Sequence, residues 1–315
     1  MGVAIIHPVI IGRLGRVGSQ WRDRPSWIPT ISKGRFVMTT RHRSARPRVS
    51  IVVPARNEAR NLWVVLPKLP QDAEIVVVDG HSDDDTIGVA RRVRPDAQVL
   101  QQTRRGKGNA LAVGFAAATG DIIVMFDADG SADPAEIDRF VDTLLGGADF
   151  AKGSRVMPGG SSADITLHRD LGNRVLTWLT NIGFRTRYSD LCYGYNAFWA
   201  DVLPYLDLPD PASTDPAMVW GDGFEIETMI NCRVAAAGLD VVEVPSIELE
   251  RQFGQSNLHA VRDGLRVLKT IRREWARARG IPEMDDDTRA RRRQNRNHYL
   301  TPPDRRPAPR LEEAS

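Results

Sequence analysis

Two aspartates separated by one residue, Asp127 and Asp129, are the part of this 315-residue chain best suited to chemistry. They follow directly on the apolar run 122–126. Two carboxylates at this spacing offer hard oxygen ligands to a divalent cation that also holds phosphate oxygens, and Mg²⁺ or Mn²⁺ is favoured. The alternative is a simple turn, because Asp, Gly and Ser are also common turn residues. The predicted strands and helices around the pair distinguish a metal site from a turn.

The apolar run before the aspartates predicts a buried strand, since it is short and bounded by turn-forming residues on both sides. A strand buried on both faces is typical of a mostly parallel sheet covered by helices. In such sheets ligands bind at the carboxyl ends of the strands. Asp127 and Asp129 would lie at that edge.

The chain around this strand alternates between strands and helices. Strands are predicted at residues 49–53, 74–78, 97–100, 149–152 and 241–244, and helices at 58–69, 83–93, 106–119, 134–145, 168–181, 221–237 and 258–279. This alternation with short loops predicts βαβ units, and therefore an α/β fold with a mostly parallel twisted sheet flanked by helices. Polar residues follow three of these strands at the same sheet edge, which favours a nucleotide-type site there.

Composition bounds the class of protein. A hydrophobic fraction of 42% and a charged fraction of 26% are ordinary for a globular protein, and we expect no nucleic-acid partner. Cys192 and Cys232 lack the spacing of a zinc site and are interpreted as free thiols in a reducing compartment. No apolar run reaches the ~18–20 residues of a membrane span, and the apolar segment 3–11 is a poor signal peptide. A cytoplasmic protein is therefore expected.

The domain organisation follows from the same patterns. Residues 48–279 are predicted to form one domain. Residues 1–47 contain Gly, Pro and Arg without periodicity and predict a disordered N-terminal extension, within which Met38 could be the real start. Pro, Asp and Arg dominate residues 280–315, which predicts a disordered basic tail.

Several short motifs occur in a fixed order between Val49 and Arg273. They are Pro54-Ala55-Arg56-Asn57-Glu58, Asp79, Asp84, Gly106-Lys107-Gly108, Asp127-Ala128-Asp129, Gly153-Ser154-Arg155 and the later Arg251-Gln252-Phe253-Gly254-Gln255-Ser256. Together they resemble family 2 glycosyltransferases with the GT-A fold. Within that family the chain is most similar to the dolichol- or polyprenyl-phosphate mannosyl- and glucosyltransferases.

The resemblance implies a nucleotide-sugar site at the sheet edge. Its residues would be Pro54, Asn57, Glu58, Asp79, Asp84, Lys107, Asp127, Ala128 and Asp129, with Asp127 and Asp129 as the metal ligands. Asn57 and Glu58 are equally suited to cap a helix. Lys107 lies between two glycines at a helix start, where backbone N–H groups and a cation can both approach phosphate. The subgroup often carries Gln two positions after the second aspartate, where this chain has Ser131.

The resemblance also implies a basic pocket for the acceptor or its phosphate. Its residues would be Arg155, Arg169, Arg174, Arg251 and Ser256. The family's lysine that follows this serine is Asn257 here. Each of these arginines is also suited to be a solvated surface charge.

The implied reaction moves a hexose from a nucleotide-sugar, GDP-mannose or UDP-glucose, to an acceptor with inversion. Asp127, Asp129, their cation and Lys107 would stabilise the leaving diphosphate. A hydroxyl acceptor needs a general base, for which Asp222 and Glu225 are the candidates, although Asp222 could instead cap a helix. A phosphate acceptor needs no base but needs arginines. The basic residues therefore favour polyprenyl phosphate.

Three alternatives stay open. The first is a glycosyltransferase acting on a saccharide or small-molecule hydroxyl. The second is a nucleotidyltransferase, although such enzymes usually carry a Gly-rich basic loop where this chain has Pro54 to Glu58. The third is a non-catalytic nucleotide-binding module.

The last predicted helix bears on the location of the protein. Its apolar positions are Leu258, Val261, Leu265, Leu268 and Ile271, with arginines around them. We expect this stripe to pack on the domain, and the alternative is a helix that lies on a membrane surface. Tail arginines would then add attraction to anionic lipid, which predicts peripheral contact with the inner face of the membrane.

Overall fold

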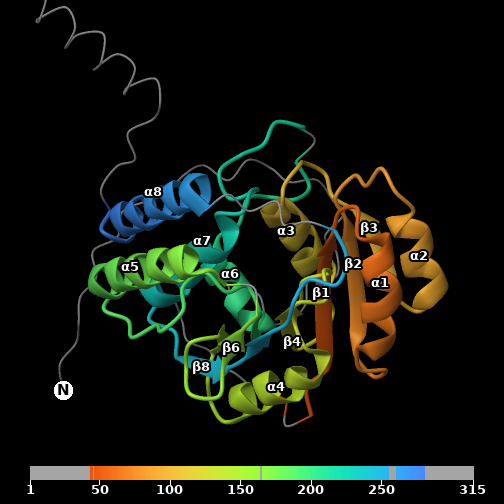
Figure 1. Ribbon diagram of the computed structural model, residues 1–315, viewed down its shortest axis with the longest axis horizontal. Coiled ribbons are helices and arrows are strands. Elements are labelled where there is room, and N and C mark those ends of the chain that lie inside the picture. The colour runs from red at the N-terminus through yellow and green to blue at the C-terminus, as the bar shows by residue number, and fades with distance from the viewer. Residues whose placement is uncertain (1–42, 45, 164, 214, 255–259, 281–315) are drawn as a thin grey trace, which may run out of the picture.

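The computed structural model describes residues 43–44, 46–163, 165–213, 215–254 and 260–280 (Figure 1). Its strands are β1 (Val49–Ala55), β2 (Glu74–Asp79), β3 (Gln98–Gln101), β4 (Ile122–Met125), β5 (Phe150–Ser154), β6 (Ser161–Ser162), β7 (Asn196–Trp199), β8 (Val241–Pro245) and β9 (Ile247–Glu248). Seven of them form one sheet in the order β3-β2-β1-β4-β7-β5-β8, and β6 pairs with β9. Only β7 runs antiparallel to its neighbours in the large sheet, so the predicted mostly parallel α/β fold is confirmed.

Helices connect and cover these strands. They are α1 (Ala59–Val65), α2 (Thr86–Val93), α3 (Lys107–Ala117), α4 (Ile137–Leu145), α5 (Leu167–Phe184), α6 (Leu203–Leu206), α7 (Ile226–Ala236) and α8 (Ala260–Ala278), with short 3₁₀ turns at Leu66–Lys68, Pro134–Glu136 and Ala200–Val202. Figure 1 shows α1 and α2 beside the β1–β3 end of the sheet, and α5 and α8 side by side at the opposite end.

The core explains why the apolar runs became strands. All four residues of β4 are buried, and so are residues 51–53 of β1 and 75–78 of β2. Aromatic rings extend the core beneath the second half of the sheet, where Phe150 stacks on Phe198 with ring centroids 5.6 Å apart. Burial of such rings is among the largest apolar contributions that a side chain can make.

The predicted site lies at the point where the order of the strands in the sheet reverses. From β1 the chain moves outward to β2 and β3, and then crosses back to β4 on the other side of β1. In open α/β sheets this switch leaves a crevice at the carboxyl ends of the two central strands. Asn57 and Glu58 follow β1 and Asp127 and Asp129 follow β4, so both segments border this crevice.

The antiparallel strand β7 was not predicted as a separate strand. Its first residue, Asn196, pairs with Met125 at the end of β4 and with Lys152 of β5. The residues that precede β7 therefore reach the same sheet edge as the loops after β1 and β4. Gly194 lies in this preceding segment.

Arg43 corrects one predicted boundary. It lies within the predicted disordered extension, yet its guanidinium is 2.6 Å from Asp149 and stacks 4.9 Å from the Trp199 ring centroid. The rest of the predicted extension before residue 43, and the predicted tail after Gly280, lie outside the described residues. In the part of the chain that is described, no helix combines the length and apolar character needed to cross a membrane.

The predicted packing of the last helix is correct only in part. Ile271 is 6% exposed and packs in a small core with Tyr188, Leu191 and Cys232. Leu265 and Leu268 are 63% and 42% exposed, so these two positions of the predicted stripe do not pack into the core. Leu258 and the side chain of Val261 lie outside the described residues.

Candidate active site

The two aspartates that follow β4 are both partnered by cationic side chains. Lys107 Nζ, at the start of α3, is 2.6 Å from Asp127 Oδ1. Arg251 Nη1 is 3.1 Å from Asp129 Oδ2. Both aspartates keep part of their surface exposed, 37% for Asp127 and 24% for Asp129. A charged ligand can therefore reach them.

Ser131 holds the second aspartate in position. Its backbone N–H and its hydroxyl both donate to Asp129 Oδ1, at 3.0 and 2.7 Å. The other oxygen of Asp129 faces Arg251. Ser131 stands where the subgroup often has Gln, and here it orients the carboxylate through hydrogen bonds.

Arg251 joins the loop after β1 to the loop after β4. Its guanidinium pairs with Glu58 as well as Asp129. Glu58 is nearly buried and also accepts from Asn61 Nδ2 at 2.5 Å. Burial raises the pKa of Glu58, against the opposing effects of Asn61 and Arg251. Arg251 therefore contacts one of the predicted metal ligands, whereas the sequence had grouped it with the predicted acceptor arginines.

Charge and burial act in opposite directions on the Lys107–Asp127 pair. Loss of solvent raises the pKa of Asp127 to about 6, although Lys107 opposes the rise. Burial alone would lower the pKa of Lys107, but the carboxylates of Asp127 and Glu227 outweigh it and raise that pKa. Lys107 therefore stays protonated at neutral pH and keeps a positive charge beside the aspartate.

The carboxylate pair fits a divalent cation that is shared with a substrate. Among the described residues no three His, Cys, Asp or Glu side chains are grouped as metal ligands. Two partly exposed carboxylates leave several coordination positions for phosphate oxygens and water, which is the usual arrangement for Mg²⁺. Asp127 and Asp129 are the residues that would hold the ion.

The predicted nucleotide residues lie at the same sheet edge. Asn57, in the left-handed conformation (φ 56°), donates its N–H to Ser82 Oγ at 2.9 Å and accepts from Asp83 N at 2.8 Å. Asp79 ends β2, is fully buried and accepts from Ser82 N at 3.2 Å. These bonds tie the loop after β1 to the loop after β2. Pro54 lies within β1, opposite Val78, and Ala128, between the two aspartates, is buried.

Asp84 has a visible structural task at this edge. One of its oxygens accepts from Ala59 N at 3.1 Å, at the start of α1. The other accepts from Thr86 N at 3.0 Å, at the start of α2. Asp84 thereby caps two helices, a common use of aspartate. Its predicted contact with a nucleotide stays a prediction.

Neither of the two predicted bases has a free carboxylate. Asp222 is 1% exposed and forms a two-pronged pair with Arg104, whose Nε and Nη2 lie 2.7 and 2.9 Å from its oxygens. Glu225 is buried and accepts from the backbone N–H groups of Gly221 and Gly223 at 3.0 and 3.2 Å. Glu225 therefore holds the segment before α7 rather than helix N–H groups, and Asp222, which was the predicted alternative cap, is a buried anchor for Arg104.

Glu227 is the carboxylate that the sequence reasoning missed. It lies in the first turn of α7, and its Oε1 is 2.5 Å from Lys107 Nζ. Lys107 thus bridges Glu227 and Asp127. Gly194 makes room for this contact, because a Cβ at that position would lie 2.3 Å from Glu227 Oε1. The signal available in the sequence was a third acidic residue two positions after Glu225, opposite a glycine.

A cavity of about 170 Å³ adjoins Glu227 on the side away from β1. Its walls come from α5, α7 and α8, and its lining is mostly apolar with a few charged groups. Arg155, Arg169, Leu176, Phe224, Glu227 and Val267 are among the residues that line it. Glu227 therefore contributes both to this cavity and to the Lys107–Asp127 cluster.

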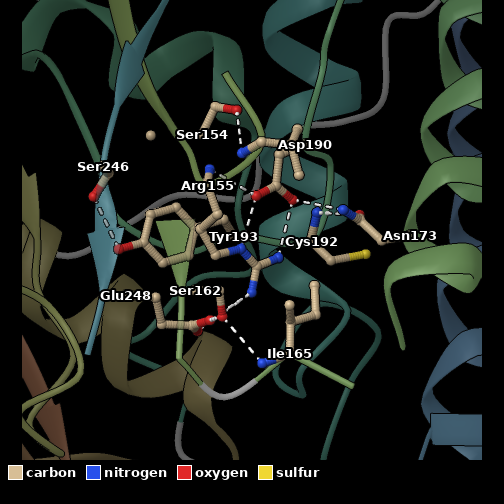
Figure 2. Close-up of polar contacts among 12 residues, drawn as sticks. Ser154, Arg155, Ser162, Ile165, Asn173, Asp190, Cys192, Tyr193, Ser246 and Glu248 are labelled. Carbon is tan, nitrogen blue, oxygen red and sulfur yellow. Dashed lines mark hydrogen bonds and ion pairs between the residues drawn. The ribbon is translucent and has the colours of Figure 1, made fainter. Parts of the chain in front are cut away.

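Arg155 is fixed at one wall of this cavity (Figure 2). Its Nε and Nη2 lie 2.7 and 3.0 Å from the oxygens of Asp190, and its Nη1 lies 3.0 Å from Glu248. The guanidinium also stacks 4.8 Å from the ring centroid of Tyr193. Burial opposes ionisation of Asp190, but Arg155 outweighs it and lowers the pKa of Asp190 to about 2. Asp190 and Glu248 were not predicted as site residues.

The remaining predicted acceptor residues are separate from this cavity or outside the description. Arg174 is 69% exposed and pairs with Asp170 at 2.9 Å within α5. Arg251 contacts Glu58 and Asp129, as described above. Ser256 lies outside the described residues. Of the predicted basic pocket, the cavity thus contains Arg155 and Arg169.

A switch-point crevice with two aspartates and a bridging lysine, next to a second cavity, is the architecture of a GT-A glycosyltransferase. The model of the family "Glycosyl transferase family 2" matches residues 50–201, and the chain belongs to this family. It is therefore a glycosyltransferase, and the nucleotidyltransferase alternative falls away.

Two characterised relatives show which branch of the family the chain resembles. Polyprenol monophosphomannose synthase from Mycolicibacterium smegmatis is 30% identical over 250 residues, 74% of this chain and 91% of the relative. Undecaprenyl-phosphate mannosyltransferase from Micrococcus luteus is 30% identical over 221 residues, 67% of this chain and 87% of the relative. The predicted similarity to polyprenyl-phosphate mannosyltransferases is thereby confirmed.

Solved structures confirm the fold. Glucosyl-3-phosphoglycerate synthase from Mycobacterium tuberculosis, in complex with Mn²⁺, UDP-glucose and phosphoglyceric acid, superposes with a TM-score of 0.58 at 22% identity. The match covers 76% of this chain and 82% of that structure. The same enzyme with Mg²⁺ and UDP gives a TM-score of 0.57.

Proposed function

We propose that this glycosyltransferase moves a hexose from a nucleotide-sugar, GDP-mannose or UDP-glucose, to polyprenyl phosphate with inversion at the anomeric carbon. The similarity to relatives named for polyprenyl-phosphate mannosyl transfer supports the acceptor. The reaction would take place in peripheral contact with the cytoplasmic face of a membrane. A divalent cation at Asp127 and Asp129 is part of the proposal.

One observation carries the proposal: Glu227 belongs to two sites at once. It contacts Lys107, the partner of Asp127, and it lines the cavity between α5, α7 and α8. A donor diphosphate at the aspartates and an acceptor in the cavity would therefore meet near this residue. The cavity combines arginines with apolar walls, which suits a phosphate attached to a hydrocarbon chain.

The residues have distinct tasks in the proposed reaction. A bound cation would supply positive charge to the leaving diphosphate. Lys107 would add a fixed cation at the same phosphates, and Glu227 would hold the lysine in place. Arg155 and Arg169 would lie beside the acceptor phosphate, because two anionic substrates repel each other unless cations separate them. An acceptor phosphate is already ionised at neutral pH and needs no base.

A second candidate acceptor is the hydroxyl of a saccharide or small molecule. The position of Glu227 favours it, because a carboxylate between donor and acceptor could remove the proton of a hydroxyl. Glu227 replaces Asp222 and Glu225 in this role, since Glu227 lines the cavity and the other two residues do not.

A phase-partition assay tests the proposal. The full-length protein is incubated with labelled GDP-mannose or UDP-glucose, polyprenyl phosphate and Mn²⁺ or Mg²⁺, and the products are extracted into organic solvent. We expect label in the organic phase, and its loss in Asp127→Asn or after chelation of the cation. Label found only in aqueous products would show that the acceptor is a soluble molecule and not a lipid.

Thermal-shift measurements identify the donor separately. We expect one nucleotide-sugar series to raise the melting temperature in the presence of Mn²⁺, because a ligand that binds only the folded state stabilises it. A shift with guanosine compounds alone would exclude UDP-glucose, and the opposite result would exclude GDP-mannose.

A further inference from the structure

The outer face of α5 carries an exposed apolar stripe. Leu171, Val175, Trp178 and Ile182 are spaced by four, three and four residues, so they lie on one side of the helix. Their exposed fractions are 65%, 51%, 61% and 61%. Single exposed apolar residues are common, but four in one continuous line on a helix mark a contact surface.

The inward side of the same helix mixes polar and apolar groups. Asn173, Thr177 and Thr180 are each at most 4% exposed. Asn173 Nδ2 donates to Asp190 at 2.8 Å, Thr177 Oγ1 accepts from Leu191 N at 3.1 Å, and Thr180 Oγ1 donates to Leu176 O at 3.0 Å. Leu176 and Phe184 pack against the small core that contains Leu191 and Cys232. The exposed stripe is a second apolar side of α5, and packing within the described part of the domain does not account for it.

Helix α8 lies beside α5 (Figure 1) and adds apolar and basic groups. Leu265 and Leu268 are exposed on it. Arg262, Lys269 and Arg272 are exposed on the same side of the helix, within about 60° of Leu265 at 100° per residue. Apolar side chains surrounded by lysine and arginine are typical of helices that bind the surface of an anionic bilayer.

The cavity of the candidate active site is walled by these two helices. Gly172 and Leu176 of α5 and Gly264 and Val267 of α8 line it. An acceptor that enters the cavity would therefore come from the side of the molecule on which α5 and α8 lie.

We propose that the outer faces of α5 and α8 form a docking surface for an anionic phospholipid bilayer. The stripe of α5 enters the boundary between headgroups and acyl chains, and the cations of α8 contact the lipid phosphates. A second copy of the chain fits this surface less well, because symmetric pairing through α8 would bring arginines and lysines together. Docking would bring the cavity to a lipid acceptor, and only this purpose rests on the proposed function.

Vesicle co-sedimentation with the full-length protein tests the surface, without donor or acceptor present. We expect binding to phosphatidylcholine vesicles that contain phosphatidylglycerol, and weaker binding to phosphatidylcholine alone. Trp178→Glu and Ile182→Glu should each weaken binding by about tenfold or more, because each places a charge in the apolar stripe. Arg272→Glu should remove most of the preference for phosphatidylglycerol. Trp63→Glu is the matched control, since Trp63 on α1 is 58% exposed, and it should bind like the wild type.

Absence of vesicle binding by the wild type, or equal binding by Trp178→Glu, would overturn the docking surface. So would a wild-type dimer that Trp178→Glu dissociates without any vesicle binding, because the surface would then belong to a second copy. Transfer of hexose to detergent-dispersed polyprenyl phosphate separates the two proposals. Loss of docking with transfer retained leaves the proposed function intact, and docking without transfer refutes the function alone.

Discussion

Acidic side chains near the crevice form two groups. One group bonds to other parts of the protein, and the other lines the candidate active site. Asp222 and Glu225 belong to the first group, since Asp222 pairs with Arg104, and Glu225 accepts two backbone N–H groups at Oε1 and faces Arg266 with Oε2. Asp127 and Glu227 belong to the second, joined through Lys107. Sequence proximity to a helix start does not distinguish these groups, because the choice depends on which residue from elsewhere in the chain lies opposite.

Substitution of Glu227 tests its role and the nature of the acceptor. With a phosphate acceptor, Glu227→Gln should lower kcat/KM by about 10- to 100-fold, because Lys107 loses one of its two anchors. With a hydroxyl acceptor the loss should be larger, about 10²- to 10⁴-fold in kcat, because the base is removed. Steady-state kinetics against pH distinguish the two outcomes. Glu250→Gln is the control, since Glu250 is exposed, and unchanged kinetics in Glu227→Gln would contradict both roles.

Substitution of Asp222 should affect stability rather than chemistry. Asp222→Asn removes the charged partner of a guanidinium that is only 1% exposed, and breaking a buried pair in this way costs about 3–5 kcal/mol of unfolding free energy. Urea unfolding followed by circular dichroism measures the change. Asp215→Asn serves as the exposed control. Normal unfolding with selective loss of kcat would restore Asp222 as a catalytic base.

Asp190 should make stability depend on pH in the acid range. Its pKa is lowered from the ordinary 3.8 to about 2, so the native state favours the ionised form. The stabilisation, roughly 2–3 kcal/mol, is complete above pH 3.8 and disappears as the pH falls through about 2. The gap in melting temperature between wild type and Asp190→Asn should therefore narrow over this interval. A gap that does not change with pH would contradict this explanation.

At the scale of elements, the start of α3 is built against the segment that precedes α7. The N–H groups of Gly108 and Asn109 donate to the carbonyl oxygen of Asp222 at 2.7 and 3.2 Å. A Cβ at position 108 would lie 1.8 Å from the carbonyl oxygen of Gly221. This close approach is what brings Lys107 of α3 to Glu227 of α7.

Gly108→Ala should separate these two elements. The added methyl group forces the backbone at Gly221 to move. The unfolding free energy should therefore fall, and the Lys107–Glu227 contact should weaken. We expect a loss of about 1–3 kcal/mol in unfolding free energy, as for other overpacked sites, together with reduced transfer activity. Gly172→Ala is the control for the unfolding free energy alone, because a Cβ there meets nothing within 4 Å. Wild-type stability in Gly108→Ala would show that the segment before α7 moves freely.

The sequence alone predicts those helices and strands that are determined by neighbouring residues in the chain. The strands β1, β2 and β4 and the helices between them follow from short apolar runs and turn residues, and the motif Asp127-Ala128-Asp129 is where the pattern placed it. β7 was missed because its sequence, Asn-Ala-Phe-Trp, contains no apolar run like the Ile-Ile-Val-Met of β4. Glu227 and Asp190 were missed for a similar reason. Their roles come from Lys107 and Arg155, which lie 120 and 35 residues away along the chain.

At the scale of the whole molecule, the proposed donor and acceptor regions come from different parts of the chain. The loops after β1, β2 and β4 would form the donor edge, and α5, α7 and α8 enclose the cavity. Arg251 connects the late loop 249–254 to both Glu58 and Asp129. A ligand that binds Asp129 would therefore compete with its ion pair to Arg251, which lies more than 120 residues later in the chain.

The position of β7 also has a consequence for the order of folding. β5 is made before β7 during synthesis, yet β7 lies between β4 and β5 in the sheet. β5 therefore has no neighbour on the side of β4 until residues 196–199 have arrived, whereas β1, β2 and β4 can pair as soon as residue 125 is present. Pairing over long sequence separations is slow, because loop closure must precede the contact. The pair Ser50–Glu74 of β1 and β2 is 24 residues apart (74 − 50), and the pair Phe150–Val241 of β5 and β8 is 91 residues apart (241 − 150). Pulse-labelled hydrogen exchange during refolding should therefore show protection in β1 and β2 before β8, and simultaneous protection of these three strands would contradict this order.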